Sequence, residues 1–290
     1  MFNPFEEKKD DQAQDRDYIV MALGGNMAAL ESLVLRHQAW IYNIAFNMIN
    51  DMHIAEDITQ EVLIKVITKL STYDAAKATF RTWLYRIVVN HIINLKESEK
   101  EKTITELVHN MDFNEFIARI PDPGNAPDTF NAHMEEETKI SCLQCILLCL
   151  NRRDRIVFVL GAVFDVNDST GSEICEITRD NFRKILSRSR IKVNNFFKKN
   201  CSLIDEKNPC RCRNKREELI KLDMIDTGNT AGRELKIKEM LRENVKSLEG
   251  SYYEFCALFK NQPFYKEPDM TIWLRDLMKR NDIQNILSIN

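Results

Sequence analysis

The stretch AEDITQEVLIKV, residues 55–66, carries apolar side chains on one side of a helix and charged or amide side chains on the other. Ile58 and Val62 are four residues apart, and Leu70 continues the series, which is the spacing of one helix face. Asp51 precedes the stretch and is a suitable N-cap, because its carboxylate can accept hydrogen bonds from the N–H groups of the first turn. We therefore predict an amphipathic helix that begins near Asp51 and ends near Leu70.

Helical periodicity continues on both sides of this stretch. Glycine (8) and proline (7) are scarce in the 290 residues, which argues against a fold rich in strands and turns. The predicted fold class is all-α: two small helical domains, joined by an acidic linker, and a helical C-terminal extension. The further predicted helices cover residues 28–49, 80–96, 138–150, 154–164, 168–176 and 179–197, with about three more within 217–290.

Length and composition are those of a globular protein with a buried core, because 44% of the residues are hydrophobic. The turn-forming stretch PDPGNAP, residues 121–127, marks a linker between two parts. The sequence contains no internal repeat. The predicted divisions are an N-terminal polar segment at 1–21, a helical domain at 22–98, an acidic linker at 99–135, a second helical domain at 136–199 and a C-terminal extension at 200–290.

No apolar stretch reaches the roughly 20 residues that a membrane-spanning helix needs. The N-terminus is polar and lacks the apolar region of a secretory signal, so the eight cysteines are expected to be reduced thiols in a cytoplasm. An enzyme is not expected either. The sequence has no carboxylate–histidine metal cluster, no GxxxxGK[ST] phosphate loop and no activated nucleophile.

The formal net charge of -3 hides an uneven distribution. Residues 97–137 carry 11 acidic and 3 basic side chains, whereas residues 179–216 carry 13 basic and 3 acidic ones. A basic block of this size is typical of a surface that binds phosphate groups. The alternative, a solvated helix face followed by a charged tail, stays open on charge alone.

Residues 168–186 fit a DNA-binding helix-turn-helix. Gly171 and Ser172 supply the small side chains that let a second helix cross closely. Glu176 occupies the turn position where glycine is usual, so we expect a positive φ at a residue other than glycine. The polar side chains predicted to face duplex DNA are those of Thr178, Arg179, Asn181, Arg183, Lys184, Ser187 and Arg188.

Two other faces have a functional and a plain interpretation. The stretch FRTWLYRIVVNHIIN, residues 80–94, interleaves aromatic and basic side chains, which suits single-stranded nucleic acid; core packing of Phe80 and Trp83 is the alternative. The polar face of the helix at 51–70 suits binding to a basic partner protein. The alternative is that this face only contacts solvent. The candidate strand-binding residues are Arg81, Trp83, Arg86, Asn90 and Asn94, and the candidate docking residues are Asp57, Gln60, Glu61 and Lys65.

Four motifs in this order resemble the sigma-70 family of bacterial transcription initiation factors, and within it the extracytoplasmic-function (ECF) group. They are GNMAALESLVLRHQAWIYNIAF (25–46), AEDITQEVLIKV (55–66), FRTWLYRIVVN (80–90) and the helix-turn-helix. The resemblance assigns residues 22–98 to region 2 and 136–199 to region 4. Residues 200–290 extend beyond a minimal ECF factor.

The resemblance implies a set of partners and roles. Region 2 would dock on the β′ clamp helices of core RNA polymerase through Asp57, Gln60, Glu61 and Lys65. The helix at 80–94 would melt the −10 element and capture a flipped base, with Asn90 and Asn94 at matching positions. Region 4 would read the −35 element and contact the β-flap, and the acidic linker would thread the RNA channel. The protein would act in the bacterial cytoplasm by binding and not by catalysis.

One alternative function and the role of the C-terminal extension stay open. The chain could be a helix-turn-helix regulator of duplex DNA that acts without polymerase, although such a protein has no use for the motifs at 55–66 and 80–90. The extension could serve as an intramolecular brake, or could dock an anti-sigma factor or a protein that targets the chain to DNA.

The cysteines give a weak zinc signal, and no cofactor is required for the inferred role. Cys201, Cys210 and Cys212 are zinc-ligand candidates. A fourth ligand is not obvious, since Cys256 is the only other downstream cysteine; free thiols in a basic loop are the alternative. The cysteines at 142, 145 and 149 share a helix face with isoleucine and leucine, so we expect them in the core, with a redox switch as the alternative.

Overall fold

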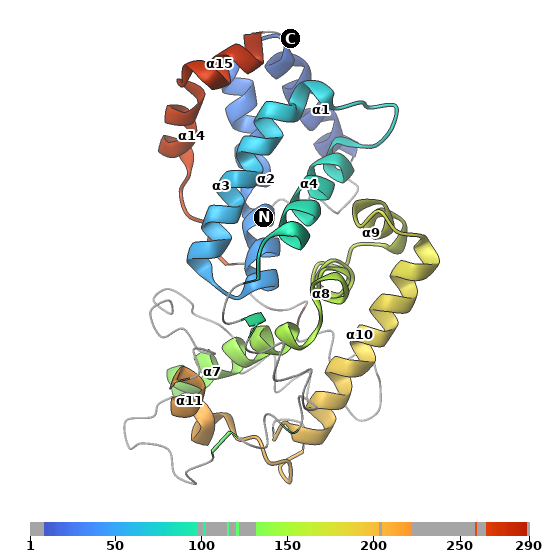
Figure 1. The fold of residues 1–290 in the computed structure, drawn as a ribbon, viewed down its shortest axis with the longest axis vertical. Helices are drawn as coiled ribbons and strands as arrows, with labels where there is room; N and C mark the ends of the chain where they lie inside the picture. Colours follow the sequence, from blue (N-terminus) through green and yellow to red (C-terminus); the bar gives the residue numbers. More distant parts are fainter. Residues whose placement is uncertain are drawn as a thin grey trace. The chain divides into compact units, whose positions relative to one another are not determined.

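The computed structural model describes residues 9–97, 132–202, 205–221 and 265–288, with short pieces at 101–102, 115, 120–121 and 259. Every regular element in these ranges is helical, apart from an isolated bridge between Cys201 and Cys210 (Figure 1). The all-α prediction is therefore confirmed. Across the same ranges, no helix has the length and apolar character needed to cross a bilayer.

The chain divides into two compact units whose boundaries differ from the predicted domains. The first unit contains residues 1–95, 166–181 and 264–290, and the second contains 96–165 and 182–263. The first unit thus combines the N-terminal helices with the first helix of the helix-turn-helix and with the end of the chain. Most of the predicted acidic linker, including residues 122–127 of PDPGNAP, lies outside the described residues.

Helix α2 is the centre of the first unit. The unit's N-terminal helices are α1 (Lys9–Leu23), α2 (Met27–Ile49), α3 (Met52–Lys69), the short η1 (Leu70–Thr72) and α4 (Phe80–Asn94). Leu33, Ile41 and Ile44 on α2 are fully buried and make the core with the apolar faces of its neighbours. Each of these helices buries one stripe of apolar side chains, and such a stripe gives the 3.6-residue periodicity from which the helices are predicted.

Side-chain caps fix where the helices of the first unit begin. The Asp51 carboxylate accepts a hydrogen bond from the Ile54 N–H at 2.9 Å, as the sequence predicts. The Asn26 side chain accepts from the N–H of Ala29 at 3.0 Å and caps α2. Each such cap satisfies a backbone donor that the helix itself cannot pair.

Helix α1 contributes a buried carboxylate to this unit, a feature that the predicted polar segment at 1–21 did not include. Asp15 lies 2.8 Å from Arg81 Nε, 3.1 Å from Arg36 Nε and 3.4 Å from His37 Nε2. Burial alone would raise the pKa of Asp15, but hydrogen bonding and charge from His37 and Arg81 bring it below its usual value. The ionised carboxylate therefore ties α1 to α2 and α4.

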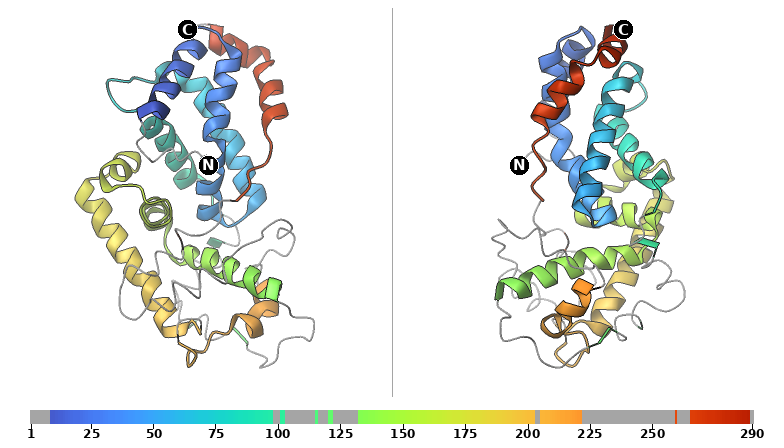
Figure 2. Two further views of the ribbon diagram at one scale, coloured as in Figure 1. Left: turned by 180° about the vertical axis from the view of Figure 1, so that it is seen from behind. Right: turned by 60° about the vertical axis from the view of Figure 1, so that its left-hand side comes forward.

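The end of the chain packs against α2 and α3. Helices α14 (Thr271–Met278) and α15 (Asn281–Ser288) lie beside them in both Figure 1 and Figure 2. Leu274, Leu277 and Ile283 are buried in this contact region. We call residues 265–288 the C-terminal strap.

The backbone of the strap is held by polar side chains of α2. Asn43 accepts from the N–H of Tyr265 at 2.7 Å and donates to the Tyr265 carbonyl at 2.9 Å. The Gln38 amide donates to the carbonyl of Pro268. Arg275 forms an ion pair with Glu31 at 2.8 Å. The strap therefore follows α2 towards its N-terminus as the chain proceeds.

The second unit is built from helices that surround a phenylalanine core. Phe158, Phe182 and Phe259 are almost completely buried, and the rings of Phe158 and Phe259 are 5.2 Å apart. Its elements are α7 (Ala132–Cys145), η2 (Ile146–Cys149), α8 (Arg152–Phe158), the π-helical turn η3 (Val159–Val163), most of α10 (Arg179–Asn200) and α11 (Cys212–Lys221).

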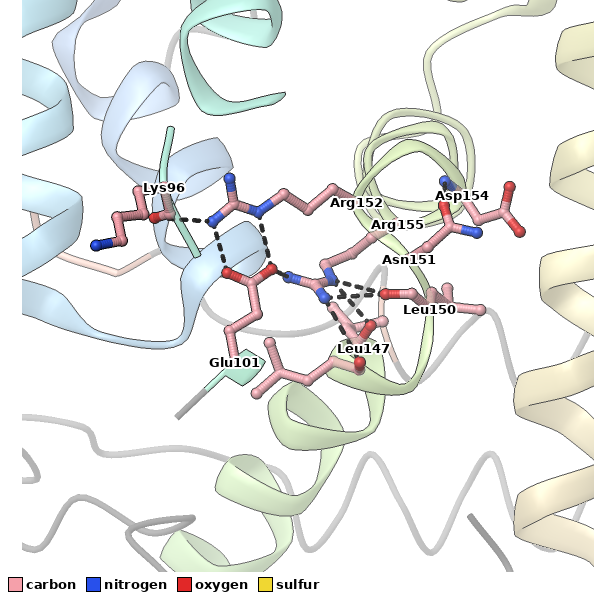
Figure 3. A network of polar contacts seen from close by, with 9 residues as sticks. Lys96, Glu101, Leu147, Leu150, Asn151, Arg152, Asp154 and Arg155 are labelled. Atoms are coloured by element: carbon pink, nitrogen blue, oxygen red, sulfur yellow. Dashed lines mark hydrogen bonds and ion pairs between the residues drawn. The ribbon is translucent and has the colours of Figure 1, made fainter. Parts of the chain in front are cut away.

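A buried ion network lies at the start of α8 (Figure 3). Glu101 is 1% exposed and accepts hydrogen bonds from Arg152 at 2.6 and 2.9 Å and from Arg155 at 2.8 Å. The Arg155 guanidinium also donates to the carbonyl of Leu150 at 2.9 Å. This network fixes Glu101 to α8 of the second unit.

Candidate nucleic-acid and partner interface

The predicted docking residues share one outward face of α3. Asp57 and Glu61 are exposed, and Gln60 and Lys65 are half-buried, while the opposite side of the helix is buried. Their spacing of three, four and eight residues keeps all four on one side of a helix. The face is polar and is available to a partner.

Two members of this face also contact α4. The Lys65 ammonium contacts Nδ1 of His91, and Nε2 of His91 lies 3.5 Å from Glu61. Burial and the charge of Lys65 lower the pKa of His91, so the imidazole is neutral near pH 7. Lys65 is therefore positioned by α4, whereas Asp57 and Gln60 have no side-chain hydrogen bond to α4 among the contacts that we describe.

The predicted strand-binding residues on α4 fall into two groups. Asn90 and Asn94 are exposed and Arg86 is half-buried, and they lie on one side of the helix at a spacing of four residues. Arg81, in contrast, is 6% exposed and is paired with Asp15. Its guanidinium belongs to the interior of the first unit, so we leave Arg81 out of the candidate surface.

Trp83 belongs to a cluster of three aromatic rings. Its ring centroid lies 5.6 Å from that of Tyr73 and 5.6 Å from that of Phe80. Phe80 is buried, whereas Trp83 is half-buried. Both interpretations of Trp83 therefore apply in part, because one side of the ring packs on the cluster and the rest is accessible.

A cavity of about 560 Å³ lies beside this cluster and was not predicted from the sequence. It is bounded by α1 and by the connection between α3 and α4. The only residue whose type could have indicated this cavity is Tyr73, an aromatic residue in the otherwise polar connector at 71–79. The lining includes Ala13, Arg16, Ile19, Tyr73, Ala75, Thr79 and Phe80.

The helix-turn-helix has the local geometry that the sequence predicts. Helix α9 (Asp168–Ile174) is followed by a turn in which Glu176 has a φ of 54°, and α10 begins at Arg179. The Thr178 hydroxyl accepts from the N–H of Asn181 at 3.2 Å and caps α10. The positive φ expected at a residue other than glycine is thus present at Glu176.

The predicted duplex-facing side chains are all on the surface, and two of the arginines are paired with carboxylates. Arg179 lies 2.7 Å from Asp168, and Arg188 lies 3.0 Å from Asp154. Exposed ion pairs of this kind are weak, so phosphate groups can replace the carboxylates. The exposed set is Thr178, Arg179, Asn181, Arg183, Lys184, Ser187 and Arg188.

Within the first unit, the turn of the helix-turn-helix contacts the polar face of α4. Asn90 donates to the Glu176 carboxylate at 3.0 Å, and Arg86 lies 3.5 Å from the same carboxylate. Arg86 also donates to the carbonyl of Glu173 at 3.0 and 3.2 Å. Two of the candidate strand-binding residues are therefore occupied by the backbone and side chain of this turn.

Comparisons with known proteins match part of this chain. The family model for sigma-70 region 2 matches residues 33–101. RNA polymerase sigma-H factor of Pseudomonas aeruginosa is 34% identical over 79 residues, 27% of this chain and 40% of that protein. ECF RNA polymerase sigma factor SigW of Bacillus subtilis is 33% identical over 76 residues, 26% of this chain and 40% of that protein. The chain thus spans about two fifths of the length of these relatives.

A longer match extends beyond region 2. ECF RNA polymerase sigma factor SigM of Bacillus subtilis is 22% identical over 158 residues, which is 54% of this chain and 88% of that protein. The α3 and α4 faces described above lie within the region 2 match.

Proposed function

We propose that this chain, which belongs to the sigma-70 family and within it to the ECF type, is a transcription initiation factor that binds core RNA polymerase and directs it to promoters. The observation that carries the proposal is the polar face of α3, where Asp57, Gln60 and Glu61 are presented by a helix inside the matched region 2. The proposed partner surface is the clamp helices of the β′ subunit. The proposed compartment is the bacterial cytoplasm, because the polymerase works there.

We propose that α4 holds the opened −10 strand. Asn90 and Asn94 have amides that can pair with the edge of an unstacked base, and Arg86 can hold a phosphate. The accessible side of Trp83 offers a stacking surface, and the cavity beside it is bounded by the aromatic side chains of Tyr73 and Phe80. Binding energy gained only with the opened strand would offset the loss of base stacking.

We propose that the exposed side chains of α10 read the −35 duplex. The N-terminal residues of a recognition helix contact base edges in the major groove, and the arginines and lysines around them contact phosphates. Asn181, Arg183 and Lys184 occupy that part of α10, and region 4 would also contact the β-flap. No catalytic step is involved, since the protein would act through differential binding.

The contact between Glu176 and α4 bears on this mechanism. Arg86 and Asn90 cannot bind a strand while they bind Glu176. The proposal therefore requires that the turn leave α4 before the −10 strand is held.

The decisive experiment is transcription in vitro with core polymerase and a library of promoters. Replacing Asp57 and Gln60 together by alanine should weaken association with core roughly tenfold or more, since truncation of residues that dominate an interface costs more than about 1 kcal/mol. The circular dichroism spectrum should stay unchanged, because Asp57 is exposed, Gln60 is half-buried and neither belongs to the core of the first unit.

Lys221→Ala is the control, because Lys221 is exposed on α11 and lies outside the matched region 2. It should leave core association unchanged. A protein that binds duplex DNA but neither associates with core nor supports initiation would favour the alternative, a helix-turn-helix regulator that acts without polymerase.

A further inference from the structure

The described cysteines of the second unit are free thiols, and the zinc-ligand candidates do not form a metal site. Cys201 and Cys210 are buried, and Cys212 is half-buried at the start of α11. In the part of the chain that the structure describes, no three His, Cys, Asp or Glu side chains are grouped as metal ligands. Of the three upstream cysteines, those at 145 and 149 are buried as predicted, and the one at 142 is half-buried. The weak zinc signal of the sequence therefore has no counterpart there.

In the first unit, a histidine of α4 lies between two charged members of the docking face of α3. Helices α3 and α4 pack against each other (Figure 1). His91 of α4 has a side chain that is 7% exposed. Its Nδ1 atom contacts the Lys65 ammonium, and its Nε2 atom lies 3.5 Å from a carboxylate oxygen of Glu61. The imidazole therefore connects α4 to two residues that are predicted to bind core polymerase.

Glu61 and Lys65 have the spacing of an ion pair but do not form one. A glutamate four residues before a lysine is the favourable order for such a pair on an exposed helix face. Among the described contacts of these two side chains, each instead contacts a different nitrogen of His91. The Glu61 side chain keeps 59% of its surface exposed. Its carboxylate is therefore accessible from solvent and is not neutralised by Lys65.

A neutral imidazole suits both of these neighbours at once. It has one nitrogen that accepts a hydrogen bond and one that donates. Because an ammonium group can only donate, Nδ1 of His91 has to be the acceptor, and the proton lies on Nε2. Nε2 is on the side of Glu61, and at 3.5 Å the attraction between them is electrostatic and longer than a hydrogen bond. Burial and the charge of Lys65 lower the pKa of His91, which favours this neutral form near pH 7.

The accessible carboxylate matters because the predicted partner surface is basic. Complementary charge on two surfaces speeds their encounter and selects the correct partner. A glutamate that is already paired with a lysine of its own helix offers little net charge to such a surface. Without the imidazole, the Lys65 side chain can turn towards Glu61, and the two charges then compensate each other.

We propose that His91 is a positioning residue of the docking face: it holds Lys65 against α4 and so keeps the Glu61 carboxylate available to core RNA polymerase. This inference rests on the proposed function of the same face. His91 itself need not touch the polymerase, since it acts through the two side chains that it separates.

The first test compares two substitutions of the histidine. His91→Ala should weaken association with core polymerase roughly two- to fivefold, which is the range expected for one exposed charge pair. His91→Gln should restore most of the affinity, because its amide oxygen can accept from Lys65 while its NH₂ group faces Glu61. Lys221→Ala is again the control. Equal weakening by the alanine and glutamine variants would overturn the proposal.

A double-mutant cycle separates positioning from a loss of structure. In the unmodified chain, Glu61→Gln should weaken core association roughly two- to fivefold, because it removes an available charge. In the His91→Ala background the same change should have little further effect, since Lys65 already compensates the carboxylate. Losses that simply add would contradict the proposal, because residues that act independently are additive.

The third test needs neither a variant nor the polymerase. Nitrogen-15 spectroscopy of the full-length unmodified chain near pH 7 should show His91 as a neutral imidazole with its proton on Nε2. A proton on Nδ1, or a doubly protonated ring, would overturn the proposal even if the alanine variant fails to fold.

The two levels of inference fail in different ways. An unmodified chain that does not bind core polymerase contradicts the proposed function. An unmodified chain that binds core, together with an equally tight His91→Ala variant, contradicts only the positioning role of His91.

Discussion

The carboxylate of Glu101 lies between two arginines in the interior of the second unit (Figure 3). Arg152 and Arg155 both belong to α8, about fifty residues away in the sequence. Charge counting placed Glu101 in an acidic stretch that was interpreted as a linker. The sequence could not reveal this role, because a buried carboxylate and a solvated one look alike until the partners are known.

Glu101→Gln should strongly destabilise the second unit. It removes the counter-charge from two buried guanidinium groups, and breaking a buried ion pair in this way costs about 3–5 kcal/mol. Denaturant unfolding followed by circular dichroism measures the change. Glu218→Gln, which breaks the exposed pair with Lys221, is the control and should leave the unfolding midpoint unchanged.

The stability that Glu101 contributes should depend on pH. Burial would raise its pKa, but hydrogen bonding from Arg152 and the charge of Arg155 bring the folded-state pKa below that of an ordinary glutamate. Its contribution is therefore complete above the unfolded-state pKa and is lost as the pH falls through the folded-state value. The difference in unfolding free energy between the unmodified chain and Glu101→Gln should shrink in acid below about pH 4. A difference that stays constant from pH 7 to pH 3 would contradict this.

At the scale of elements, apolar periodicity and capping residues predicted most of the helices of the first unit and the helix-turn-helix. The helices around 28–49, 51–70 and 80–96 and the helix-turn-helix each bury one stripe, and Asp51 and Thr178 cap as predicted. The C-terminal strap was not predicted, because its position depends on hydrogen bonds between α2 and residues more than two hundred positions later. The candidate surface on α4 was predicted by residue type, but the burial of Arg81 depended on Asp15 of α1.

The strap should be held chiefly by Asn43. Asn43→Ala leaves the buried N–H and carbonyl of Tyr265 without their side-chain partner, at a cost of about 1–3 kcal/mol for each group left unsatisfied. Amide hydrogen exchange should show faster exchange throughout residues 265–288. Arg275→Ala removes only the exposed ion pair between the strap and Glu31. It should therefore change the amide exchange rates of residues 265–288 little. Equal effects from the two variants would argue against this assignment.

The turn of the helix-turn-helix should compete with single-stranded DNA for α4. Glu176→Ala removes the carboxylate that contacts Arg86 and Asn90, so affinity for a single-stranded −10 oligonucleotide should rise roughly two- to fivefold. Fluorescence anisotropy measures the affinity. Glu173→Ala is the matched control, because only the backbone of Glu173 makes the described contacts with α4. Weaker binding by Glu176→Ala would show that the carboxylate assists the strand instead.

At the scale of the whole molecule, the near-neutral net charge conceals a basic block at residues 179–216. The exposed side chains of α10 belong to this block, including Arg183 and Lys184. The sequence alone reveals the block, because the count of charges needs no tertiary structure, and its binding to DNA stays a prediction. It did not predict that Arg179 and Arg188 have carboxylate partners in the free protein.

Arg183→Ala should weaken binding to duplex −35 DNA and make it less sensitive to salt. Each phosphate contact that is lost should reduce the slope of log affinity against log salt by about 0.9. Titrations at several salt concentrations give the slope. Lys221 lies outside the basic block, so Lys221→Ala is the control and should leave the slope unchanged. A weaker affinity with an unchanged slope would mean that Arg183 reads a base and does not contact a phosphate.

The C-terminal strap also has a consequence for synthesis of the chain. Ribosomes release α2 and α3 early, but the residues that cover them appear only after synthesis has passed position 265. Asn43 and Phe46 contact Tyr265 in the folded protein. Until Tyr265 has been synthesised, these two side chains lack that contact and are exposed. The first unit is therefore completed only after more than two hundred further residues have been translated, and a chain that stalls before the strap presents this face to chaperones.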